Sequence, residues 1–133
     1  MIVVDASAVL DMLLQAESAE HIATIVLAPT QRLHAPHVLD VEVAQVLRRL
    51  VLRKEITAAR AQLALQDFSS LVIDRHSHLP MLSRIFELRD SVTAYDGAYI
   101  ALAEALNAPL MTSDGRLARS HGHRARVTFA GVR

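Results

Sequence analysis

Four acidic side chains have the residue type and the setting needed for metal chemistry: Asp5, Glu42, Asp96 and Asp114. Mg²⁺ prefers hard oxygen ligands, takes few of them from protein, and leaves its other positions to water and substrate phosphates. An ion held in this way can activate water and neutralise the charge that builds on a phosphodiester. The four acids therefore predict a catalytic site in which carboxylates bind a metal or position the attacking water.

Three of these acids also have a simpler explanation, and the fourth does not. Asp5 and Asp114 could each cap the helix that follows, and Thr93-x-x-Asp96 matches a capping box. Glu42 lies beyond the cap positions of the segment VLDVEVAQVLRRL, with a valine on either side. An isolated charge in apolar surroundings costs several kcal/mol, so an unpartnered carboxylate would tend to keep its proton. A shared metal ion explains all four residues.

The elements that must position these acids alternate between short strands and helices. Apolar, β-branched runs predict strands at 1–5, 32–35, 71–74, 109–114 and 126–129. Helical spacing and cap residues predict helices at 6–16, 18–28, 37–54, 57–69, 78–89, 94–107 and 115–121. This alternation predicts a single α/β domain over residues 1–133, with a short parallel sheet flanked by helices. Because ligands bind at the carboxyl ends of such strands, we expect the four acids on one rim.

The composition narrows the class of protein further. The 14 basic residues balance the 14 acidic ones, which argues against a protein that coats nucleic acid. The absence of cysteine excludes disulfides and thiolate metal sites, and it suits a reducing compartment. The apolar N-terminus lacks a basic leader and is interrupted by Asp5, and no apolar run reaches the roughly 18 residues of a membrane helix. We therefore expect a cytoplasmic protein.

Four segments together resemble the PIN-domain family: VVDASAVL, VEVAQVLRR, TAYDGAYIALA and TSDGRLA, in that order over nearly the whole chain. The small size resembles VapC-type toxins of bacterial toxin–antitoxin pairs. The resemblance implies a PIN-like three-layer fold and a Mg²⁺- or Mn²⁺-dependent endoribonuclease, usually a homodimer, inhibited by a small cognate antitoxin. The family's acids fall on Asp5, Glu42, Asp96 and Asp114, and its supporting polar positions fall on Ser7 and Thr112.

Two positions depart from the family's pattern. The residue three after the glutamate is often asparagine in the family and is Gln45 here, which we include as a supporting polar residue. Some members have a further acid two residues after the last aspartate, where this chain has Arg116. The segment after Asp114 contains no acidic side chain. We expect Arg116, and Arg119 one helical turn later, to contact RNA phosphates, although arginines near a helix end also merely complement its dipole.

Other classes of protein remain open at this stage. A phosphatase of the haloacid dehalogenase type usually needs a second aspartate two residues after the first, where this chain has Ser7. A receiver domain needs a late lysine, and the only lysine is Lys54. A catalytically degenerate PIN fold that serves as a binding module is the non-enzymatic alternative. Tyr95 and Tyr99 could stack bases or pack in the core, and the aliphatic faces of 18–28 and 37–54 could form a dimer seam, an antitoxin groove or ordinary core.

Overall fold

A five-stranded parallel sheet forms the centre of the computed structural model, which describes residues 1–131. Its strands are β1 (Ile2–Val4), β2 (Leu33–Pro36), β3 (Ile73–His76), β4 (Leu110–Thr112) and β5 (Val127–Phe129). They lie in the order β3-β2-β1-β4-β5, and every neighbouring pair is parallel. The carboxyl ends of all the strands therefore meet at one rim, and the predicted α/β class is confirmed.

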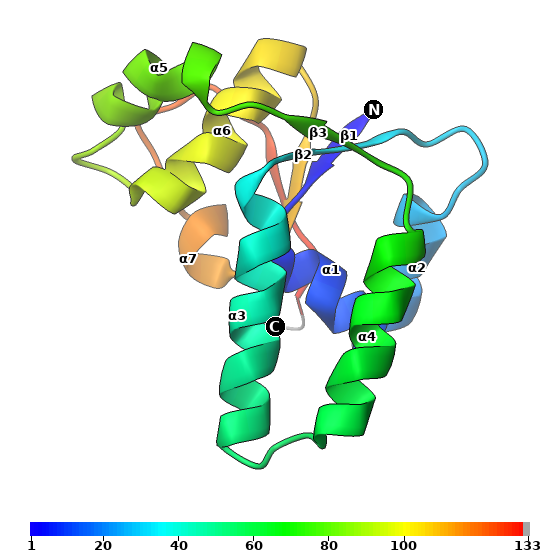
Figure 1. Cartoon of the computed structure of the whole chain (residues 1–133). Helices are drawn as coiled ribbons and strands as arrows, with labels where there is room; N and C mark the ends of the chain where they lie inside the picture. Colours follow the sequence, from blue (N-terminus) through cyan, green and yellow to red (C-terminus); the bar gives the residue numbers. More distant parts are fainter. Residues whose placement is uncertain (132–133) are drawn as a thin grey trace.

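Helices cover the sheet in two groups. They are α1 (Ala6–Leu13), α2 (Ala19–Val26), α3 (Val38–Leu52), α4 (Ala58–Ser70), α5 (Leu82–Glu87), α6 (Ala94–Leu106) and α7 (Gly115–Ala118). Helix α6 packs on β1, β2 and β4 and against α5, whereas α1 contacts β4, α2, α3 and α4. Figure 1 shows α5 and α6 together on one side, and α3 and α4 running side by side as an antiparallel pair that projects away from the sheet.

Helix α6 begins and ends where the sequence provides caps. The Thr93 hydroxyl accepts a hydrogen bond from the Asp96 N–H at 3.2 Å, which satisfies one of the free donors of the first turn. At the other end Asn107 adopts a left-handed conformation with φ of 50°, and the Ala108 N–H bonds back to Ala103. Pro109 comes next and leads into β4. Because α6 is tied to β4 at this end and packs along β1, β2 and β4, its first turn has a fixed place relative to the sheet.

Several elements are shorter than the sequence predicts, among them the helix expected over 115–121, which ends at Ala118, and two elements differ in position or continuity. The third strand lies at Ile73–His76 instead of 71–74, because Leu71 ends α4 and Val72 is 86% exposed. The helix expected over 78–89 is divided into a short 3₁₀ turn, η1 (Leu79–Met81), and α5. Pro80 lies in that turn and has no N–H to donate, so the regular helix begins only after it.

Among residues 1–131, no helix combines the length and the apolar character required to cross a lipid bilayer.

Candidate active site

Asp5 is the most deeply buried of the four acids, with 5% of its surface exposed. It follows β1 directly and caps α1, since its Oδ1 accepts from the Ala8 N–H at 2.9 Å. The Ser7 hydroxyl donates to the same oxygen at 2.7 Å, and the Thr112 hydroxyl donates to Oδ2 at 2.5 Å. Burial nevertheless outweighs these bonds and raises the pKa of Asp5 to about 6. The protein therefore holds a carboxylate in a place where its negative charge is costly.

Asp114 lies on the neighbouring strand end and shares the supports of Asp5. Val4 stands opposite Met111 in the β1–β4 register, so the residues that follow the two strands emerge side by side. The Asp114 N–H donates to Thr112 Oγ1 at 2.9 Å, and the Ser113 N–H donates to Ser7 Oγ at 2.9 Å. Asp114 also caps α7 by accepting from the Arg116 N–H at 2.9 Å. The capping explanation is thus correct for Asp5 and Asp114, and it does not exclude a further role.

Glu42 projects from α3 and has a partner that the sequence prediction did not assign. The Tyr99 hydroxyl of α6 donates to Glu42 Oε1 at 2.5 Å. Burial raises the pKa of Glu42, the bond from Tyr99 lowers it, and the charge of Asp96 raises it. Tyr99 is 1% exposed, so it packs in the core and fixes Glu42, whereas Tyr95 is 62% exposed. The clue in the sequence is the spacing, because Tyr99 stands three residues after Asp96 on one helical face.

Asp96 completes the group from the first turn of α6. Its partial burial raises its pKa, the negative charge of Asp114 raises it further, and the positive charge of Arg116 lowers it. The pKa of Asp5 responds in the same direction to Asp114, and that of Glu42 to Asp96. The four carboxylates, which come from four separate parts of the chain, therefore form a series in which each is close enough to repel its neighbour.

All four predicted acids line a single cavity of about 430 Å³. Ser7, Asp11 and Tyr99 also line it, and two cations stand at it, Arg49 from α3 and Arg116 from α7. Arg116 Nη2 lies 3.5 Å from Asp114 Oδ2 and keeps most of its side chain exposed. This acid cavity combines a concentration of carboxylate oxygens with arginines that can hold phosphate.

Two of the predicted supporting or RNA-contacting residues lie away from the acid cavity. Gln45 is exposed on α3 and does not line it. Arg119 is also exposed, and its guanidinium lies against Gly115, where an added Cβ would come within 2.8 Å of Nη1. Ser7 and Thr112, in contrast, both contact Asp5.

The donor set fits a hard divalent cation. Apart from the guanidinium groups of Arg49 and Arg116, which cannot bind a metal, the polar side chains that line the cavity are carboxylates, a hydroxyl and a phenol, with no histidine among them. Within residues 1–131, no three histidine or acidic side chains are already arranged as a complete metal-binding group. Mg²⁺ needs only one or two direct carboxylates when water fills its other positions. The cavity offers four carboxylates whose negative charges are disfavoured by burial or by a neighbouring carboxylate. A bound cation would offset these charges, and the open cavity leaves room for its water ligands.

Comparison with known proteins agrees with this geometry. The family model for the PIN domain matches residues 2–121. The chain belongs to the PIN-domain family. Ribonuclease VapC12 of Mycobacterium tuberculosis is 41% identical to this PIN domain over 127 residues, which cover 96% of the chain and 97% of that protein. VapC ribonuclease Mb0985 of Mycobacterium bovis is 45% identical over 117 residues, which cover 88% of each protein.

Solved structures share the fold of this PIN domain. PAE2754 from Pyrobaculum aerophilum superposes with a TM-score of 0.68 at 22% identity, covering 95% of this chain and 81% of that one. VapBC2 from Rickettsia felis, solved bound to a DNA fragment from its promoter, gives a TM-score of 0.67 at 14% identity, covering 97% and 98%. At these identities the likeness establishes the fold alone.

Proposed function

We propose that this PIN domain is a VapC-type endoribonuclease, the toxin of a type II toxin–antitoxin pair, which hydrolyses RNA phosphodiester bonds with a divalent metal ion. The proposal rests above all on one observation, the convergence of Asp5, Glu42, Asp96 and Asp114 on one cavity. Relatives at 41% and 45% identity, matched over most of their length, are named ribonucleases and support the same reaction.

In this proposal the four acids hold the ion or orient the attacking water. Mg²⁺, or Mn²⁺ in its place, would supply Lewis-acid chemistry that activates water and offsets negative charge on the phosphate. Ser7 and Thr112 fix the orientation of Asp5 through both of its oxygens. Tyr99 fixes Glu42, and Arg116, which lines the same cavity, is placed to hold a phosphate oxygen.

The test compares metal dependence and acid dependence in one RNA cleavage assay. Wild-type protein should cleave single-stranded RNA with Mg²⁺ or Mn²⁺ and stop in EDTA. Asp96→Asn should remove that activity, whereas Asp40→Asn should keep it. Asp40 lies on the same helix as Glu42, but its carboxylate pairs with Arg75 at 2.9 Å and does not line the acid cavity. Cleavage that persists in EDTA, or in Asp96→Asn at the rate of Asp40→Asn, would contradict the mechanism.

We also propose that a small cognate antitoxin binds the groove between α1, α2 and α4. A cavity of about 590 Å³ lies there, and its lining combines the apolar side chains of Met12, Leu13, Leu27 and Leu71 with polar ones such as Glu20. Leu27 is 58% exposed, so this surface offers apolar area to a partner. Both proteins would act in the cytoplasm. Co-expression with a small protein encoded next to the toxin should suppress RNA cleavage, and Leu27→Glu should relieve that suppression.

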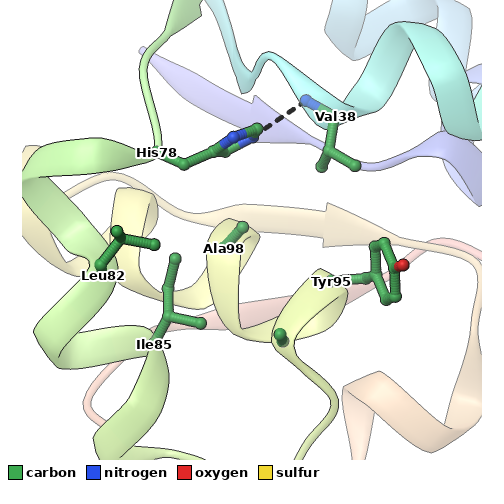
Figure 2. A pocket seen from close by; sticks show the side chains of 7 residues that line it. Val38, His78, Leu82, Ile85, Tyr95 and Ala98 are labelled. Carbon is green, nitrogen blue, oxygen red and sulfur yellow. Dashed lines mark hydrogen bonds between the residues drawn. The ribbon is translucent and has the colours of Figure 1, made fainter.

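The homodimer is proposed on a different surface, around the pocket in Figure 2. Val38, Leu82, Ile85 and Tyr95 line this apolar pocket, and His78 borders it by accepting the Val38 N–H at 3.1 Å. The elements at the pocket, α3, η1, α5 and α6, carry large exposed apolar side chains, namely Val41, Leu79, Leu82, Phe86 and Tyr95. Sedimentation of the wild type should give a dimer mass, and Leu82→Glu should give a monomer.

A further inference from the structure

A second polar cavity, of about 330 Å³, adjoins the acid cavity. The segment 89–93 forms one wall, and α7 contributes Arg116 and Leu117. Asp96 and Arg116 line both cavities, so they form the boundary between the two. A ligand that reaches the four acids from this side must pass these two side chains. We refer to this second space as the flanking cavity.

The flanking cavity has a cation, Arg89, that is held in position and forms no ion pair with an acidic side chain of residues 1–131. Arg89 Nη1 donates to the Phe86 carbonyl at 3.0 Å, and its guanidinium lies 4.6 Å from the centroid of the Phe86 ring. That hydrogen bond uses one of the five N–H donors of the guanidinium. Arg89 is exposed and lines the flanking cavity. Its orientation is therefore fixed while donors stay available for a ligand.

The remaining lining combines apolar and polar groups. Leu117 is 1% exposed and Val92 is partly buried, so they give the cavity an apolar base. Ser91 adds a hydroxyl. The segment after α7 approaches this hydroxyl closely, because a Cβ on Gly122 would lie 2.7 Å from Ser91 Oγ. Asp90 offsets one of the two arginines. Asp96 at the boundary offsets the other, so the formal charges of the lining cancel, and Arg116 also lies 3.5 Å from Asp114 Oδ2.

We propose that the flanking cavity binds the nucleotide next to the scissile phosphodiester. Arg89 then contacts its phosphate, and the apolar surface of Leu117 and Val92 packs against its ribose or nucleobase. This inference rests on the proposed ribonuclease function. Phosphate contacts position a strand without reading its sequence, and a hydrogen bond from an arginine to an anion is short and directional. Arg89 is then a positioning residue for the strand and has no part in the chemical step.

The experiment measures RNA binding separately from cleavage. Arg89→Gln is compared with Arg126→Gln in an Asp114→Asn background, with a fluorescent single-stranded RNA as the probe. Arg126 is a matched control, because it is also exposed and donates to a backbone carbonyl, that of Asn107, at 3.0 Å, but it does not line the cavity. Arg89→Gln should weaken RNA binding about tenfold and lower the salt slope by about 0.7. Arg126→Gln should match the parent.

A cleavage arm in the otherwise wild-type protein locates the bound nucleotide. Arg89→Gln should raise KM with kcat unchanged on a full-length RNA. Two further RNAs end at the scissile phosphate, one lacking the nucleotides on its 5′ side and the other those on its 3′ side. The rise in KM caused by Arg89→Gln should persist with one of them and disappear with the other, which lacks the nucleotide that the flanking cavity binds. Equal binding by Arg89→Gln and Arg126→Gln, with wild-type cleavage intact, would overturn this inference alone. Wild-type protein that neither binds nor cleaves RNA would overturn the proposed function and this inference with it.

Discussion

The Tyr99 hydroxyl donates to Glu42 Oε1 at 2.5 Å and joins α6 to α3 across the acid cavity. Tyr99 is buried and contributes no charge of its own, since burial and the adjoining carboxylates raise its pKa far above its ordinary range. The bond satisfies a carboxylate that would otherwise stand half-buried without a partner, and it lowers the pKa of Glu42 against the effect of burial. Glu42 therefore depends on Tyr99 for both its position and its charge.

Tyr99→Phe should move the acidic limb of the pH–rate profile upward. Loss of the donor removes the interaction that lowers the pKa of Glu42, so a higher pH is needed to ionise this carboxyl. The unsatisfied Glu42 should also cost about 1–3 kcal/mol of stability. Tyr95→Phe is the control, because Tyr95 is 62% exposed and does not line the acid cavity. Superimposable pH profiles for the two variants would show that the bond does not set the charge of Glu42.

Asp5→Asn should make the metal-free protein less sensitive to pH while abolishing cleavage. The pKa of Asp5 rises from 3.8 to about 6 in the folded state, so the native protein binds this proton more tightly than the unfolded chain. Stability should then fall as pH rises from about 4 to 6, by up to roughly 3 kcal/mol from this group. Asparagine removes the titration. Urea unfolding at pH 4 and pH 8 checks this, and an unchanged wild-type pH dependence in Asp5→Asn would contradict it.

Mg²⁺ or Mn²⁺ should raise the melting temperature of the wild type. An ion that binds only the folded state stabilises it by about 2.7 kcal/mol when its concentration is 100 times its dissociation constant. The increase should be smaller in Asp96→Asn and Asp114→Asn, whereas Asp40→Asn should respond like the wild type. A flat thermal-shift titration into millimolar Mn²⁺ would count against any ion at these carboxylates.

The sequence was sufficient for the fold class and for the expectation that the four acids lie together at one rim, because both depend on local patterns. Strand ends, helix caps and one misplaced charge indicated Asp5, Asp96, Asp114 and Glu42, which the structure brings to one cavity. The Tyr99–Glu42 bond joins residues 57 positions apart, and the spacing of Tyr99 from Asp96 places it on the face of the acids without naming Glu42 as its partner. Arg119 is the opposite case, a position that the sequence predicted and the structure does not bring to the cavity. Its spacing from Arg116 suggested a shared helical face, but its side chain lies against Gly115. Side-chain direction on a four-residue helix cannot be read from spacing alone.

Glu104→Gln should loosen the packing of α6 against α5 and the tail. Arg84 bonds both oxygens of Glu104, at 2.7 and 2.9 Å, and the Arg124 N–H donates to it at 2.7 Å. These partners, Arg84 first, lower the pKa of Glu104 to about 2. The stability that ionised Glu104 gives the folded state is therefore complete above about pH 4.5 and is lost as the pH falls through 2. Breaking the pair should cost about 3 kcal/mol near neutral pH and little near pH 2. Glu87→Gln, at a 65% exposed partner of Arg84, should cost under about 1 kcal/mol.

Arg116→Ala and Arg119→Ala should differ in their effect on RNA binding, although Arg116 lies on α7 and Arg119 is the residue that ends it. Arg116 lines the acid cavity and the flanking cavity, whereas Arg119 lines neither. In an Asp114→Asn background, Arg116→Ala should weaken single-stranded RNA binding across sequences and lower the salt slope by about 0.7 for one lost phosphate contact. Arg119→Ala should leave both quantities near the parent. Equal losses in the two variants would mean that the RNA lies over the outer face of α7 and not across the boundary formed by Asp96 and Arg116.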